Sequence, residues 1–279
     1  MSELFPEVIK ETLEITFLVL LTMITIDVVS VFTKGKLDEF LKNKKYMQYV
    51  TASFLGTIPG CFGGFTNVSL YIHRLISFGA ITGGMIASSG DEAFVMISLF
   101  PKKALFLFLL LFISGIIFGI LIDYIYPLFK IKPCTECVLQ EYHAEDFSFS
   151  HYLKVHVWDH LLKKHLWKLF IWTFLTLLSI EFLMKFWNLE TFVKNNLLLV
   201  FLFAAALAIL PESGPHLIFV MMFSKGMIPF SVLFVSAFAQ DGHGMLPMLS
   251  YSIKDFFYIK FFNIIIGLLI GVILFGFGY

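Results

Sequence analysis

Two short stretches in the second half of the chain place ionisable and amide side chains between apolar runs. "ILPESGPH" covers residues 209–216, and "AQDGHG" covers residues 239–244. Carboxylate, amide and imidazole groups together are suited to Mn²⁺ and similar divalent ions. The candidate metal ligands in these stretches are Glu212, His216, Gln240, Asp241 and His243.

The first half holds a comparable pair of stretches, "IPGCFGG" at 58–64 and "SSGDE" at 88–92. They add Asn67, Asp91 and Glu92 to the candidate ligands. Proline and glycine free backbone groups from helical hydrogen bonds, and a membrane protein tolerates this only inside protein or beside a water-filled cavity. We therefore expect the breaks of both halves to face one cavity near the middle of the membrane. The residues expected to break the helices are Pro59, Gly60, Cys61, Pro211, Ser213, Gly214 and Pro215.

Two further carboxylates, Asp27 and Glu181, lie inside long apolar runs. Ionisable groups at membrane depth usually mark a transport pathway, so we predict that these two carry coupling protons. Hydrogen bonding between helices is the alternative for this pair. For Asp91, Glu92 and Asp241 the alternative is the capping of helices at the membrane surface.

A polar linker holds a separate group of candidate metal ligands. Cys134 and Cys137 form a Cys-x-x-Cys pair, and His143, His156 and His160 follow it. Cysteine and histidine in this arrangement can bind Zn²⁺ or another transition metal, although the spacing matches no standard zinc module. The alternative is an amphipathic helix that lies on the cytoplasmic surface of the membrane.

The composition requires these residues to be positioned by membrane helices. The chain has 279 residues, of which 58% are hydrophobic and 14% charged, whereas a soluble domain carries about 25% charged residues. Its formal net charge is zero, which argues against nucleic acid as a partner. The runs that reach the roughly 20 apolar residues of a membrane helix are about 15–33, 104–129, 167–187 and 257–279. Regions 47–100 and 196–250 are apolar but repeatedly interrupted, so each is expected to form three shorter or broken elements.

An internal repeat organises the chain as two membrane halves, 1–129 and 166–279, joined by a cytoplasmic linker, 130–165. Four pairs match in one order: Thr25–Asp27 with Ser179–Glu181, Ile58–Pro59 with Leu210–Pro211, Asp91 with Asp241, and Gly115–Leu121 with Gly267–Ile273. Their residue numbers differ by 154, 152, 150 and 152. Five elements per half make the second half enter the membrane from the opposite side, as in inverted-repeat transporters. The fold class is therefore an all-α integral membrane protein with about ten membrane segments.

The basic residues set the expected orientation. Lysines are concentrated at 34–45 and in the linker, and such an excess is typical of cytoplasmic loops. Both termini are then expected outside a prokaryotic cytoplasmic membrane.

The same residues carry a resemblance to a known family. "LPESGPHLIFVMMFSKGMIPFSVLFVSAFAQDGHGMLPMLS" and "GTIPGC…GAITGGMIASSGDEAFVM" resemble two signatures of the ten-transmembrane heavy-metal exporters, whose members are labelled arsenic efflux proteins or manganese transporters and which resemble organoarsenical permeases. The resemblance implies ten membrane segments and export of a metal or metalloid. It assigns to the site Pro59–Cys61, Gly90–Glu92, Glu212–His216 and Gln240–Gly242. Glu212 and Ser213 stand where relatives carry cysteine or glutamine, which weakens the case for thiophilic arsenite.

The expected function is export of a divalent metal cation, most of all Mn²⁺, by proton antiport. No nucleotide-binding motif G-x-x-x-x-G-K-[ST] is present, so direct ATP coupling would need another subunit. A transporter with no tightly bound cofactor is expected rather than an enzyme; an intramembrane metallohydrolase is a third alternative, although the motif H-E-x-x-H is absent. Arsenite or organoarsenical efflux is the alternative within the same class. A lipid-phosphate translocase or phosphatase is the alternative of another class, although a single arginine, Arg74, counts against it. The expected partners are the bilayer and the metal ion, and a homo-oligomer stays open.

Overall fold

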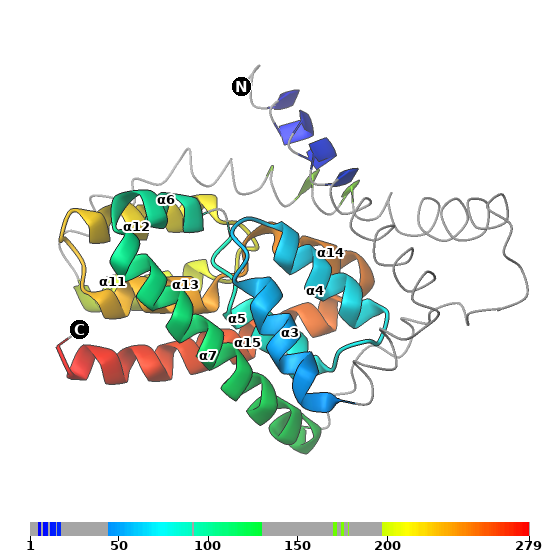
Figure 1. Ribbon diagram of the computed structural model, residues 1–279. Helices are drawn as coiled ribbons and strands as arrows, with labels where there is room; N and C mark the ends of the chain where they lie inside the picture. The colour runs from blue at the N-terminus through cyan, green and yellow to red at the C-terminus, as the bar shows by residue number, and fades with distance from the viewer. Residues whose placement is uncertain are drawn as a thin grey trace, which may run out of the picture.

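The computed structural model describes residues 5–6, 8–10, 12–14, 16–17, 44–90, 92–129, 170–171, 174–175, 178 and 197–278. Within these residues all regular structure is helical and there is no strand (Figure 1). The expected all-α class therefore agrees with the part of the chain that the structure describes.

The described stretches 44–129 and 197–278 each contribute four short helices followed by one long helix (Figure 1). In the first half these are α3 (Lys45–Gly56), α4 (Phe62–Ile72), α5 (Phe78–Ile86), α6 (Glu92–Leu99) and α7 (Pro101–Ile125), which continues into the 3₁₀ turn η1 (Tyr126–Phe129). In the second half they are α11 (Leu197–Leu207), α12 (Leu217–Ser224), α13 (Phe230–Ala239), α14 (Leu246–Tyr251) and α15 (Ile253–Gly276). Two 3₁₀ turns, η3 (Gly214–His216) and η4 (Gly242–Met245), precede α12 and α14. The chain also leaves helical geometry at 87–90 and at 240–241. The expectation of three shorter or broken elements before each long helix stays a prediction, because two short helices can belong to one broken element.

The long helices α7 and α15 belong to the segments that can cross a bilayer. In the described part of the chain, Pro101–Leu128 and Ile253–Gly276 are long and apolar enough to do so. Each exposes a stripe of large apolar side chains four residues apart, a spacing that keeps them on one helix face. The stripes are Leu105, Leu109, Ile113, Ile117 and Leu121 on α7, and Phe257, Phe261, Ile265, Leu269 and Ile273 on α15. These faces suit contact with lipid, as expected for runs 104–129 and 257–279; the other two runs, 15–33 and 167–187, lie largely outside the described residues.

The short helices are too short to cross a membrane singly. The 12 residues of α3 and the 8 residues of α6 rise about 18 Å and about 12 Å at 1.5 Å per residue. The hydrocarbon core of a bilayer is about 30 Å thick. Such helices reach about halfway, so their ends bring polar backbone groups to mid-membrane depth.

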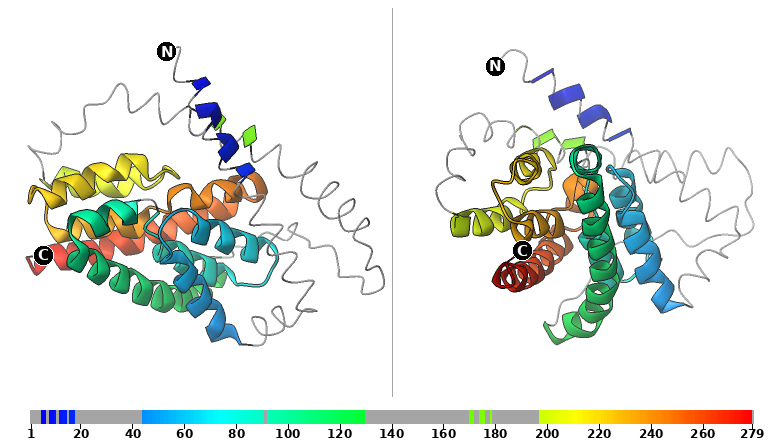
Figure 2. Two further views of the ribbon diagram at one scale, coloured as in Figure 1. Left: turned by 45° about the horizontal axis from the view of Figure 1, so that its top comes forward. Right: turned by 60° about the vertical axis from the view of Figure 1, so that its left-hand side comes forward.

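The two halves repeat one order of helices. The first residues of α5 and α13, and of α7 and α15, are 78 and 230, and 101 and 253, so each of these two pairs differs by 152. In the first half α5 packs on α3 and α7, and in the second α13 packs on α11 and α15. In Figure 1 and the left view of Figure 2, α7 runs toward the right and α15 toward the left. This order and direction are those expected of an inverted repeat, whose two-fold axis stays a prediction.

Glycines permit close helix contacts both within and between the halves. A Cβ added to Gly83 of α5 would lie 2.2 Å from the carbonyl oxygen of Gly115 of α7. Between the halves, a Cβ at Gly64 of α4 would lie 2.7 Å from Cα of Gly244 in η4. Contacts of α6 with α12 and of α5 with α15 add to this junction. The halves therefore share one core.

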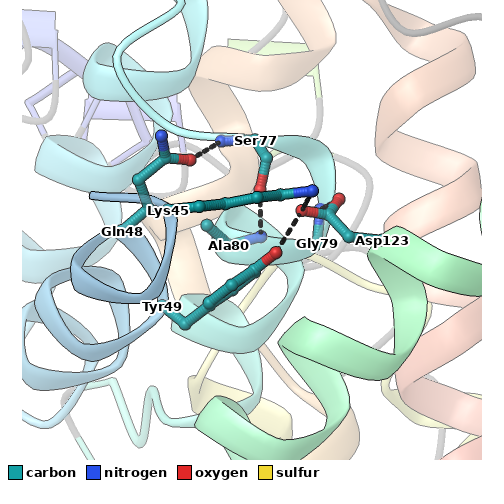
Figure 3. Close-up of polar contacts among 7 residues, drawn as sticks. All are labelled: Lys45, Gln48, Tyr49, Ser77, Gly79, Ala80 and Asp123. Carbon is teal, nitrogen blue, oxygen red and sulfur yellow. Dashed lines mark hydrogen bonds and ion pairs between the residues drawn. The ribbon is translucent and has the colours of Figure 1, made fainter. Parts of the chain in front are cut away.

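A buried carboxylate at the end of α7 joins three helices of the first half (Figure 3). Asp123 accepts hydrogen bonds from the Tyr49 hydroxyl at 2.7 Å and from the Gly79 backbone N–H at 2.7 Å. The exposed Lys45 places its ammonium 3.9 Å from the same carboxylate. Since all partners of Asp123 are protein groups of α3 and α5, this cluster is an anchor for helix packing.

Candidate functional site

The interruptions of both halves meet at one place, which we call the crossing. It consists of the helix-free segments 57–61, 87–90, 208–213 and 240–241. The Gly60 backbone N–H donates to the Gly90 carbonyl at 3.0 Å. Gly90 and Gly242 have positive φ angles of 52° and 54°, which glycine adopts without steric cost. A Cβ at either glycine would lie 2.6 Å from Oγ of Ser213, so the Ser213 side chain lies directly against both glycines.

Glu212, His243 and Cys61 form a continuous polar chain across the crossing. Glu212 Oε2 lies 2.6 Å from His243 Nε2, and the other carboxylate oxygen of Glu212 accepts from the Gly214 backbone N–H at 3.0 Å. The second ring nitrogen of His243, Nδ1, lies 3.6 Å from Cys61 Sγ. Glu212 and His243 are buried, and Cys61 is partly buried. These three side chains therefore bring together an oxygen, a nitrogen and a sulfur donor. Glu212 and His243 come from the second half, and Cys61 comes from the first.

Asp241 is held by two side chains of α15 rather than standing open to the crossing. Lys260 Nζ lies 2.8 Å from Asp241 Oδ2, and the Asn263 amide donates to Asp241 Oδ1 at 3.0 Å. Lys260 also donates to the Ala208 carbonyl at 2.6 Å. Lys260 is 2% exposed and Asp241 1%, so both charges are withdrawn from solvent and balance each other.

The remaining candidate ligands are dispersed over neighbouring helices. His216 Nδ1 lies 2.7 Å from the Ser236 hydroxyl in the contact between η3 and α13. The Asn67 amide donates to the Ala52 carbonyl at 2.9 Å and so ties α4 to α3. Glu92 is buried at the first residue of α6. Of these three, Glu92 lies nearest in sequence to the crossing.

Several buried polar atoms of the crossing have no hydrogen-bond partner within the described part of the chain. These atoms are the Ser213 hydroxyl, the Ser89 hydroxyl, and both the amide oxygen and nitrogen of Gln240. Gln240 is 0% exposed, and its amide oxygen would lie 3.6 Å from a Cβ at Gly90. Leaving buried polar groups unpaired is costly. Such atoms are therefore suited to bind a ligand or its hydration water.

Among the described residues, no three histidine, cysteine, aspartate or glutamate side chains already converge on a metal position. Glu212 and Cys61 approach opposite nitrogens of the His243 ring, and this places the imidazole between them. A metal bound by Glu212 and His243 requires a turn of the imidazole or of the carboxylate. The crossing thus holds suitable ligands in an arrangement closed by hydrogen bonds.

Some predicted site residues lie outside the described residues. They are Asp27, Asp91, Glu181, Cys134, Cys137, His143, His156 and His160. Conversely, sequence reasoning missed Lys260 and Asn263, both inside "YIKFFNIII" at 258–266. An ammonium and an amide in a membrane run are the kind of signal that marks a site, and the same rule that selected Asp27 would have found them.

The chain was compared with known proteins once this geometry was established. A family model described as "Putative, 10TM heavy-metal exporter" matches residues 7–186 and 167–277. No curated protein and no solved structure matches the chain.

Proposed function

Because the chain belongs to the 10TM heavy-metal exporter family, a family of multi-pass membrane transporters, we propose that it exports a divalent metal cation through the crossing. The family match covers both halves and confirms the resemblance found in the sequence. Beyond family membership, we propose the kind of ion that is transported, the residues that bind it, and the energy source of transport.

The observation that carries the proposal is the location of the Glu212–His243 pair beside unpaired polar atoms. Glu212 supplies the negative charge, and His243 supplies a nitrogen donor 2.6 Å away. Gln240 and the Ser213 hydroxyl supply further oxygens at the same crossing. Sites at the interface of broken helices, near mid-membrane, are the usual arrangement in repeat-built transporters.

The donor types favour Mn²⁺ and make Zn²⁺ its main competitor. Carboxylate and carbonyl oxygens suit Mn²⁺, imidazole suits Zn²⁺ and related ions, and a thiolate shifts preference toward softer metals. With Cys61 as the one sulfur in contact with His243 among the described residues, the set remains mostly oxygen and nitrogen. Arsenite prefers thiolate ligands, so these oxygen and nitrogen donors are less suited to bind it.

We propose proton antiport as the driving reaction, with Asp27 and Glu181 as proton carriers. Both lie in apolar runs, where a carboxylate is costly unless it serves a pathway. The lysine-rich linker would face the cytoplasm, with both termini outside. Cys134 and Cys137 of that linker could hold a second metal, such as Zn²⁺, without taking part in transport.

Everted membrane vesicles test the proposal directly. Vesicles that contain the full chain should accumulate Mn²⁺ when an imposed pH gradient, acid inside, is present and ATP is absent. Glu212→Gln removes the charge that attracts the cation, so accumulation should fall by about tenfold or more. Parallel assays with Zn²⁺ and arsenite rank the substrates.

Asp123→Asn is the matched control, because Asp123 is also a buried carboxylate but anchors helices away from the crossing. This variant should lower thermal stability and leave the order of ion preference unchanged. Wild-type vesicles that accumulate none of the three substrates, or a Glu212→Gln protein that transports Mn²⁺ at the wild-type rate, would overturn the proposed function.

A further inference from the structure

Lys260 is the one described lysine that is almost completely buried, and it lies within the membrane-crossing helix α15. It is 2% exposed, and α15 otherwise presents apolar side chains or amides near it, such as Asn263. A fixed positive charge is an unexpected neighbour for a cation pathway, because it repels the ion that the pathway must admit. Its contacts therefore need a functional explanation.

The contacts of Lys260 join both segments that carry the proposed metal ligands. Its ammonium lies 2.8 Å from Asp241, two residues before His243, and 2.6 Å from the Ala208 carbonyl, four residues before Glu212. Ala208 directly follows α11, where carbonyls lack helical partners. A movement of the ammonium would therefore release Asp241 and one end of the Glu212 segment together.

Stability alone accounts poorly for this ion pair. Removing two charges from water costs more than their attraction commonly returns, and neutral replacements of a buried pair are often as stable as the pair itself. What the pair does achieve is charge balance, since the Lys260 ammonium lies 2.8 Å from the Asp241 carboxylate.

We propose that Lys260 competes with the transported metal for the Asp241 carboxylate. Its ammonium pairs with Asp241 when no metal is bound at the crossing, and the divalent cation displaces it on binding. The inference rests on the proposed function. In the metal-bound state Asp241 joins Glu212 and His243 as a third ligand, and repulsion between the metal and the ammonium displaces Lys260. Lys260 thus sets how tightly the metal binds and promotes its release, because its return to Asp241 expels the ion.

The experiment measures Mn²⁺ affinity by electron paramagnetic resonance titration of the purified full chain. In Lys260→Gln the competitor is gone, so Mn²⁺ should bind at least tenfold more tightly than in wild type, while export in vesicles slows. Lys260→Arg keeps the positive charge and should bind Mn²⁺ within about threefold of wild type. A folded Lys260→Gln protein with wild-type affinity would overturn the inference.

The double variant Asp241→Asn with Lys260→Gln provides an independent test, since it removes both charges together and leaves no unpaired ion. Here Mn²⁺ affinity should fall at least tenfold below wild type, because the third ligand is lost. A double variant with wild-type affinity would show that the pair is structural. If wild type binds Mn²⁺ and Glu212→Gln does not, the proposed function stands even where the Lys260 variants contradict this inference.

Discussion

Among the side chains described at the crossing, the thiol of Cys61 is the group least suited to a hard ion such as Mn²⁺. Its sulfur lies 3.6 Å from His243 Nδ1, at the amino-terminal boundary of α4. Sulfur adds little to the binding of Mn²⁺ but contributes strongly to that of Zn²⁺. Under the proposed function, the thiol would therefore determine how far softer ions compete with Mn²⁺.

We predict that Cys61→Ser changes ion selectivity more than activity. Zn²⁺ accumulation in vesicles should fall by about tenfold and Mn²⁺ accumulation by about twofold or less, because only the softer ion loses a favoured donor. Replacing Cys134 and Cys137 of the linker by serine together is the control and should leave both fluxes unchanged. An equal loss of both fluxes in Cys61→Ser would mean that Cys61 is needed for packing.

At the scale of single residues, the sequence did not predict which side chains contact one another. Glu212 and His243 were candidate ligands and Cys61 a residue of the helix break, and the structure places the three in contact, while metal binding by them stays a prediction. Asp241 was assigned to the same site, yet its carboxylate is bound by Lys260 and Asn263. That contact depends on how α15 packs against the crossing, and no spacing within one segment encodes it.

At the scale of helices, the crossing depends on two backbones that touch without side chains between them. Gly64 of α4 faces Gly244 of η4, and a Cβ at Gly64 would lie 2.7 Å from Cα of its partner. Side chains can move aside, but a backbone atom cannot do so without shifting its whole segment. The position of His243, the residue before Gly244, therefore depends on this contact.

We predict that Gly64→Ala destabilises the protein and reduces transport. Overpacking of a tight contact costs about 1–3 kcal/mol, which should appear as a lower midpoint of thermal unfolding in detergent. Gly276→Ala is the control, because Gly276 ends α15 with nothing within 4 Å of its added Cβ. Alanine there should be neutral or stabilising by up to about 1 kcal/mol. Similar unfolding midpoints for the two variants would refute the close contact.

The pattern of apolar residues predicts the long helices but does not predict how many short helices form between them. The long apolar runs predicted the ends of α7 and α15 to within a few residues. About twenty apolar residues with few breaks are expected to form a membrane-spanning helix. The interrupted regions were expected to form three shorter or broken elements each, and four short helices occupy each region in the described residues. Pro59 and Gly90 both lie in helix-free segments, and the sequence does not distinguish a kink inside one element from a turn between two.

At the scale of the whole molecule, the account rests on two halves that enter the membrane from opposite sides and meet at the crossing. Helices α5 and α13, and likewise α7 and α15, begin 152 residues apart, and the same difference pairs Gly90 with Gly242, which share positive φ. The register assumed for Asp91 and Asp241 was two residues shorter. Helices α7 and α15 run in opposite senses (Figures 1 and 2), which is the relation that inverted halves require.

The sidedness of two matched lysines measures this arrangement directly. Lys102 and Lys254 occupy the second position of α7 and α15, are both exposed, and differ by 152 residues. Each is replaced by cysteine in a chain whose Cys61, Cys134 and Cys137 are serine, and a membrane-impermeant maleimide is applied to right-side-out and inside-out vesicles. We predict that Lys102→Cys is labelled in one vesicle orientation and Lys254→Cys in the other. Labelling of both cysteines from the same side would contradict the inverted halves, and with them the crossing as the centre of the transport path.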